Sequence, residues 1–157
     1  MSTVAHNSRI TPFLWFDNNA EEAARFYTGI FPGSRILETV PNHTGTSPAT
    51  AAVLLVHFEL DGTRFTALNG GPQFPFNESI SFVIHCATQA EIDYYWERLI
   101  AEGGSEVQCG WLKDKYGISW QVVPAHISHL ARSRNAMLAL MQMKKLDIAA
   151  LERAAQQ

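Results

Sequence analysis

The histidines of this chain have the chemistry for metal binding or proton transfer, but they form no recognised motif. His57 lies within an apolar, strand-like run and His85 ends another, and neither belongs to an HxH or HExxH pair. His126 and His129 follow Pro124 at a spacing of three, which would place both on one side of a helix. That spacing would suit a shared metal or two polar side chains on a short helix. We expect His57 and His85 to be satisfied strand residues.

The two cysteines are the candidate nucleophiles. Cys86 lies just before a predicted helix start, where the helix dipole can lower a thiol pKa, and Cys109 has Lys113 near it in sequence. Neither thiol has a base partner visible in the sequence, so a buried, unreactive cysteine is the alternative for each. Two cysteines without a CxxC pair are too few for a disulfide framework, which predicts a reduced, cytoplasmic location.

A weak internal repeat with an offset of 70 residues organises the elements that must position these side chains. Residues 20–26 and 33–34 align with residues 90–96 and 103–104, and each block follows one strand-like run and precedes another. The first copy predicts a strand at 10–16, a helix at 20–31 and strands at 35–40, 53–60 and 63–68. The second predicts a strand at 80–85, a helix opening at Thr88, and strands at 105–109, 111–114 and 118–123. The order of strand, helix and three strands therefore occurs twice.

Local signals mark the ends of these elements. Asn19 and Thr88 each precede a glutamate by three residues, which is capping-box spacing at a helix start. Asp61–Gly62 is a hairpin signal, and residues 41–50 form a polar loop. These signals support two modules of the same kind.

The residues after Pro124 predict a helical segment. Met137, Leu138 and Met141 have helical spacing, and Asp147 is a plausible N-cap for the last helix. A methionine-rich stripe of this kind is more typical of core or dimer packing than of a cofactor site. We expect this segment to be a packing appendage.

The composition predicts a soluble globular protein. The chain has 157 residues, of which 46% are hydrophobic and 17% charged, and its formal net charge is −3 with no basic block. Nucleic acid is therefore not an expected partner. The longest apolar run, Ala51–Val56, is far shorter than the roughly 20 residues that span a bilayer, so a membrane is not expected either. Residues 1–9 lack the apolar core of a secretory signal and predict a flexible tail.

The duplicated module resembles the vicinal oxygen chelate superfamily, which includes glyoxalase I and bleomycin-resistance proteins. Within it, four segments are similar to the PhnB-like branch that is often labelled 3-demethylubiquinone-9 3-methyltransferase-like. They are DNNAEEA at 17–23 with Phe26–Tyr27, LNGGP at 68–72, CGWLKDKYGISWQVVP at 109–124, and MKKLDIAAL at 143–151. The resemblance implies an α+β fold of two paired βαβββ modules with a C-terminal helical appendage. It also implies curved sheets that cup a site, with pairing within one chain or across a homodimer, and we expect a homodimer.

Metal enzymes of the superfamily take ligands from the first and last strands of each module. The strand starts here carry Ile10–Pro12 and Ser79–Ser81, and the last-strand positions carry Thr66 and Gln121. Only Gln121 has a usable ligand atom, and one neutral amide cannot hold a divalent metal alone. The sequence therefore predicts no metal and no cofactor.

The methyltransferase label has no supporting motif. Common S-adenosylmethionine enzymes place a glycine-rich turn after a parallel strand, whereas the paired glycines here are Gly70–Gly71 and Gly103–Gly104 within predicted antiparallel blocks. P-loop and GxSxG motifs are also absent from the sequence. We do not expect methyl transfer.

Aromatic and amide side chains remain as candidates for holding a ligand. The predicted ligand-binding residues are Trp15, Asn69, Trp111, Ser119 and Gln121. Strand alternation puts Ser119 and Gln121 on one face and Trp120 on the other, under the helix. A small planar or amphipathic ligand, held by stacking and amide hydrogen bonds, fits such residues. The alternative is that the tryptophans fill the core or a dimer seam.

The leading hypothesis is a small-molecule binding protein or a metal-independent enzyme of this fold. Two alternatives remain: a metal-dependent lyase, isomerase or dioxygenase of the same superfamily, and a dimeric, resistance-type sequestering protein. Whether the protein is an enzyme stays open. The expected organisation is a tail at 1–9, modules at 10–78 and 79–124, and a helical segment at 125–157.

Overall fold

The structure, a computed structural model, describes residues 8–43 and 51–157. Most of the predicted tail (residues 1–7) and of the predicted polar loop (residues 44–50) therefore lies outside the described residues. The chain divides into two compact units, Met1–Pro75 and Phe76–Gln157, and each is described by itself.

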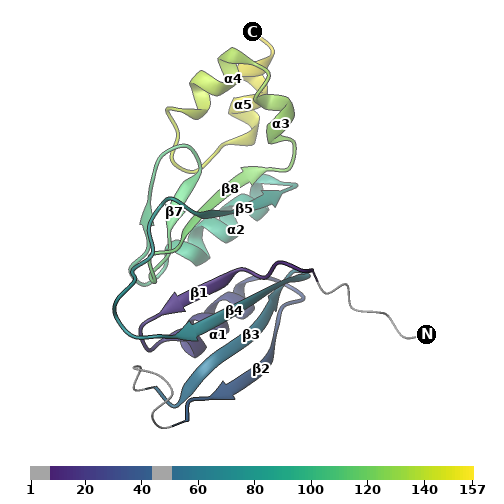
Figure 1. Cartoon of the computed structure of the whole chain (residues 1–157). Helices are drawn as coiled ribbons and strands as arrows, with labels where there is room; N and C mark the ends of the chain where they lie inside the picture. The colour runs from purple at the N-terminus through teal and green to yellow at the C-terminus, as the bar shows by residue number, and fades with distance from the viewer. Residues whose placement is uncertain (1–7, 44–50) are drawn as a thin grey trace, which may run out of the picture. The chain divides into compact units, whose positions relative to one another are not determined.

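The first unit contains a four-stranded sheet and one helix. Its elements are β1 (Phe13–Phe16), α1 (Ala20–Ile30), β2 (Arg35–Pro41), β3 (Val53–Leu60) and β4 (Thr63–Asn69). The strand order is β1-β4-β3-β2, in which β1 runs parallel to β4 and the other neighbours are antiparallel. Figure 1 shows α1 lying along one face of this sheet. The predicted order of strand, helix and three strands is confirmed.

The core of the first unit forms where α1 meets the sheet, because the apolar side chains of the helix recur every three to four residues. The buried residues of α1 are Ala20, Ala23, Ala24, Tyr27 and Ile30. The ring centre of Tyr27 lies 6.4 Å from that of Phe58, which lies 5.4 Å from that of Phe65. Alternation along β3 then places Leu55 and His57 on the face opposite α1.

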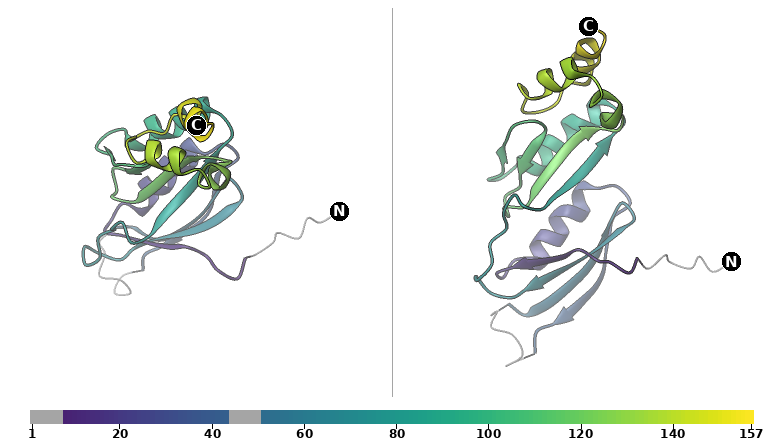
Figure 2. Two further views of the ribbon diagram at one scale, coloured as in Figure 1. Left: turned by 90° about the horizontal axis from the view of Figure 1, so that it is seen from above. Right: turned by 45° about the horizontal axis from the view of Figure 1, so that its top comes forward.

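The second unit repeats this topology. Its first elements are β5 (Ser81–Cys86), α2 (Gln89–Ile100), β6 (Ser105–Glu106), β7 (Trp111–Lys113) and β8 (Ser119–Pro124). The strand order β5-β8-β7-β6 matches that of the first sheet, with β5 parallel to β8. Figure 2 shows α2 along one face of this sheet. Both modules are therefore βαβββ units of one mixed topology.

The strand β6 ends earlier than the predicted strand 105–109. Cys109 and Gly110 have φ angles of 63° and 83°, and this left-handed conformation excludes Cys109 from the strand. A Cβ on Gly110 would lie 3.0 Å from the Leu146 side chain, so the close approach of the C-terminal segment also favours glycine there.

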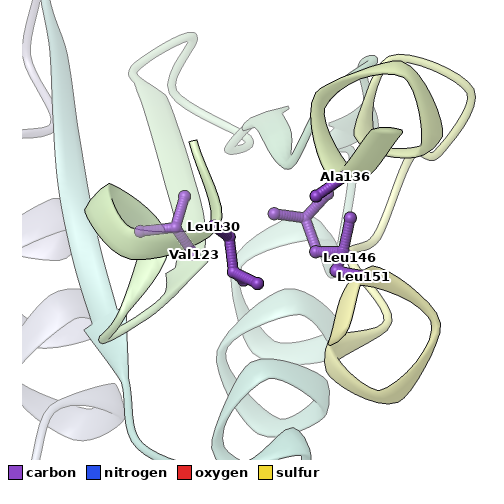
Figure 3. Close-up of a cluster of buried hydrophobic side chains, with 5 residues drawn as sticks. All are labelled: Val123, Leu130, Ala136, Leu146 and Leu151. Carbon is purple, nitrogen blue, oxygen red and sulfur yellow. The ribbon is translucent and has the colours of Figure 1, made fainter. Parts of the chain in front are cut away.

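Three short helices complete the second unit. They are α3 (Ile127–Leu130), α4 (Arg134–Leu140) and α5 (Ile148–Ala155). A buried cluster joins them to the end of β8, and Figure 3 shows its members Val123, Leu130, Ala136, Leu146 and Leu151. The Asp147 carboxylate accepts a hydrogen bond from the Ala150 amide at 3.0 Å, which confirms it as an N-cap. No helix in the described part of the chain is long and apolar enough to cross a membrane.

The predicted methionine stripe does not form the core of this segment. Leu138 is 51% exposed and Met141 is 59% exposed, so the core interpretation is wrong for both. The face of α4 that packs on the core instead carries the buried Ala136 and the partly buried Ala139 and Leu140, one residue out of phase with the predicted stripe. Dimer packing by the exposed pair stays a prediction.

Candidate functional site

The candidate site is the face of the second sheet opposite α2, which we name the Gln121 face. Its residues, set by strand register and alternation, are Ser81, Val83, His85, Trp111, Lys113, Ser119, Gln121 and Val123. Trp120 points to the α2 side, is buried, and donates its indole N–H to the Asp114 carboxylate at 2.9 Å. The predicted alternation between Gln121 and Trp120 is therefore confirmed.

Gln121 lies at the centre of this face. Its Nε2 donates a hydrogen bond to the Ser81 hydroxyl at 2.9 Å. In the strand register Gln121 is opposite Trp111 on one side and Val83 on the other. Directly opposed side chains in an antiparallel pair have Cβ atoms about 4.5–5.5 Å apart. The structure thus places an oriented carboxamide beside a partly exposed indole, which can hold a planar polar molecule.

Ser119 and Lys113 form the next row of the same face. Ser119 is opposite both Lys113 and Ser81, and it is only 1% exposed. Its hydroxyl has no hydrogen-bond partner among residues 8–43 and 51–157. The ammonium of Lys113 pairs with the carboxylate of Glu78 and holds the pKa of that carboxyl below its usual value. This row therefore combines the buried Ser119 hydroxyl with the Lys113 ammonium, which is already paired with the Glu78 carboxylate.

Trp15 lies on the corresponding face of the first sheet, opposite α1. We name this the His57 face; its residues are Phe13, Trp15, Leu55, His57, Thr66 and Leu68. The Trp15 indole donates to the Gly71 carbonyl at 2.9 Å and meets the Phe74 ring edge-on with centres 4.9 Å apart. A Cβ on Gly70 would lie 2.4 Å from the indole, so Trp15 packs on that glycine. Trp15 therefore holds the loop after β4 in place.

Asn69 does not lie on either of these faces. It is 1% exposed on the α1 side of the first sheet, opposite Phe16 in the register. Its Oδ1 accepts from the Ala20 amide at 2.9 Å and its Nδ2 donates to the Val53 carbonyl at 2.8 Å. The expectation that Asn69 faces the ligand is corrected: its carboxamide caps α1, while Asn19 makes no side-chain capping bond.

His57 has a partner that the sequence analysis missed. Its Nδ1 lies 2.9 Å from the Thr66 hydroxyl, in one cross-strand row that continues to Glu38 on β2 and Phe13 on β1. Counting outward from the Asp61–Gly62 turn would have paired His57 with Thr66, so the signal was present. The row places an imidazole between a carboxylate position and a hydroxyl.

Cys86 does not supply a nucleophile to the Gln121 face. Cys86 is fully buried, and this burial raises the pKa of its thiol to about 12, with a smaller contribution from the charge of Glu91. The thiol is therefore protonated near neutral pH and behaves as a small apolar residue. Cys109 is half-buried, and its backbone amide donates to the Met143 carbonyl at 2.8 Å.

The residues around Gln121 do not fit a divalent metal. Its Nε2 is bonded to Ser81, and its neighbours in register, Trp111 and Val83, offer no metal ligand. Within residues 8–43 and 51–157, no group of three or more His, Cys, Asp or Glu is arranged to hold a metal. His126 contacts the Glu152 carboxylate at 3.1 Å. The expected absence of a metal stays a prediction.

Comparison with known proteins identifies the family of this chain. The family model described as 3-demethylubiquinone-9 3-methyltransferase matches residues 8–123. The chain belongs to this family. The membership also confirms the predicted vicinal oxygen chelate superfamily. The match ends at Val123, so the resemblance of the tail at 143–151 lies outside it.

Solved structures share the fold of this family. A PhnB protein from Bacillus cereus that bears the same family name is 32% identical, with 75% of this chain and 100% of that chain covered and a TM-score of 0.68. Protein PA1353 from Pseudomonas aeruginosa is 22% identical over 74% and 96% of the two chains, with a TM-score of 0.60. The fosfomycin resistance protein FosX from Mesorhizobium loti is 12% identical over 80% and 98%, with a TM-score of 0.56, and shows a common fold alone. The search of curated proteins found no match.

Proposed function

We propose that this protein binds a small planar molecule on the Gln121 face. The observation that carries the proposal is the hydrogen bond from Gln121 to Ser81, which orients the carboxamide next to Trp111. An oriented amide can hydrogen-bond a polar edge of a ligand while the indole stacks on its plane. Each of these contacts is worth roughly 0.5–1.5 kcal/mol, so together they support modest affinity and clear selectivity for planar molecules.

The proposal covers a binding protein and a metal-independent enzyme, and turnover distinguishes them. A bound molecule that is recovered unchanged after long incubation marks a binding or sequestering protein, whereas a converted one marks an enzyme.

We do not extend the family name to methyl transfer, because the two four-stranded sheets with their antiparallel β2-β3-β4 and β6-β7-β8 blocks lack the doubly wound parallel arrangement of the common methyltransferases. We also keep the homodimer and the cytoplasmic location as proposals, and native mass spectrometry of the purified protein tests the dimer.

The test uses 2-naphthamide as a planar probe with a polar amide. Gln121→Ala is expected to weaken its binding about tenfold, which corresponds to about 1.4 kcal/mol, because the oriented hydrogen bond is lost. The melting temperature should change little, since Gln121 is partly exposed and bonds only a side chain. Isothermal titration calorimetry measures the affinity.

Gln142→Ala is the matched control, because Gln142 is an exposed glutamine of the same unit and belongs to none of the strands that form the Gln121 face. It should leave naphthamide binding unchanged. A large loss of melting temperature in Gln121→Ala with unaltered binding would make Gln121 a structural residue and contradict the proposal.

A further inference from the structure

Three side chains with hydrogen-bond donors lie in one row of the Gln121 face. Ser81, Ser119 and Lys113 occupy one cross-strand row of β5, β8 and β7. Ser81 accepts from the Gln121 amide, so its own hydroxyl proton is directed elsewhere. The buried hydroxyl of Ser119 has no partner among the described residues. A row with one ammonium and two hydroxyl donors is suited to an oxyanion.

The chain itself already places a carboxylate at this row. Glu78, in the segment before β5, forms an ion pair with Lys113, and the two side chains are 57% and 35% exposed. An exposed pair of this kind contributes little to stability and is easily exchanged for another anion. The pair therefore shows that Lys113 binds a carboxylate, and the exposure of Glu78 allows another carboxylate to replace it.

Resting on the proposed function, we propose that the ligand of the Gln121 face is a planar monocarboxylate whose carboxylate displaces Glu78 from Lys113. The ligand carboxylate accepts hydrogen bonds from Lys113 and Ser119, and its planar part stacks on Trp111. A monoanion matches the single cation of the row, whereas a dianion such as a phosphonate would leave one charge unpaired. Glu78 then acts as an internal competitor that lowers the apparent affinity of the site.

The experiment compares 2-naphthoate with 2-naphthamide, which have the same ring and differ in charge. Calorimetry on the full chain should show naphthoate binding at least tenfold more tightly. Lys113→Met should abolish this preference, because the cation is lost. Glu78→Gln should tighten naphthoate binding several-fold and leave naphthamide binding unchanged, because the competing carboxylate is gone.

A second ion pair of the same unit supplies matched controls. Lys145 and Asp93 are 2.9 Å apart, and they lie on the C-terminal segment and α2, outside the Gln121 face. Lys145→Met and Asp93→Asn make the same charge changes and should leave both affinities unaltered. A general electrostatic effect would instead appear equally in these two variants and would overturn the assignment.

The remaining outcomes separate this inference from the proposed function. If naphthamide binds as tightly as naphthoate, or if Glu78→Gln weakens naphthoate binding, the carboxylate inference is wrong while planar binding stands. If neither molecule binds to the unaltered chain or to Glu78→Gln, the proposed function fails together with the inference.

Discussion

The two modules have one topology but carry different chemistry at equivalent positions. In the register of each sheet, Thr66 corresponds to Gln121, and His57 corresponds to Trp111. The first module thus places an imidazole next to a hydroxyl, and the second an indole next to a carboxamide. The fold is the same because the helix-facing residues are apolar in both. The comparison shows that the faces opposite the helices are free to diverge, so function must be argued from those faces.

Equivalent positions on the helix side behave differently, since they are constrained by packing. Cys86 ends β5 where Phe16 ends β1, and both are buried. If the two positions are equivalent, Cys86 is a core residue and not a nucleophile. Among our predictions, the largest expected effect is therefore on the alkylation rate of the Cys86 thiol.

With its pKa raised by burial to about 12 from 9.0, the Cys86 thiol should carry about 1,000-fold less thiolate at pH 8 than an ordinary cysteine. Alkylation of Cys86 by iodoacetamide, followed by peptide mass spectrometry, should therefore be at least about 1,000-fold slower in the native protein than in the protein unfolded in urea. Because the folded pKa is raised, this group stabilises the fold below pH 9 and loses that contribution as the pH rises toward about 12. Rapid labelling of Cys86 in the native protein would contradict its equivalence to Phe16.

The helices α1 and α2 begin at equivalent points but are capped in different ways. The Thr88 hydroxyl caps α2 locally by accepting from the Glu91 amide at 3.2 Å, whereas Asn69 caps α1 from the end of β4. Asn69→Ala is expected to lower the free energy of unfolding by about 2–3 kcal/mol, because the buried Ala20 amide and the partly buried Val53 carbonyl both lose their partner. Thr88→Ala should lower it by about 1 kcal/mol. Urea denaturation followed by circular dichroism measures both.

Asn19→Ala is the control for these capping variants, since Asn19 occupies the N-cap position without a side-chain capping bond. Its effect should stay below about 0.5 kcal/mol. An equal loss in Asn19→Ala and Asn69→Ala would show that α1 is capped locally after all.

Local signals in the sequence were enough to predict the order of the helices and strands and which residues of β8 face the candidate site. Hairpin pairing and the N-caps at Thr88 and Asp147 involve residues a few positions apart, and the alternation of Ser119 and Gln121 follows from strand geometry alone. The internal repeat predicted the duplicated topology, which the two strand orders confirm, and the family segments predicted the family, which the family model confirms over residues 8–123.

Contacts between distant residues could not be predicted in this way. The Asn69 bond to Ala20 spans 49 positions and the Gln121 bond to Ser81 spans 40, and both depend on the parallel pairing of first and last strands. No short-range pattern in the sequence predicts this parallel pairing of strands. The Trp15 bond to Gly71 was missed for the same reason.

The central claim is that the second module, through the Gln121 face, binds the planar ligand. The four tryptophans of the chain allow a direct test, because the indole N–H groups of Trp15, Trp96 and Trp120 are each hydrogen-bonded to the protein. A titration with 2-naphthamide, followed by the indole signals in ¹H–¹⁵N NMR spectra, should shift the Trp111 signal and leave those of Trp96 and Trp120 in place. A shift of the Trp15 signal without one at Trp111 would assign binding to the first module and contradict the account.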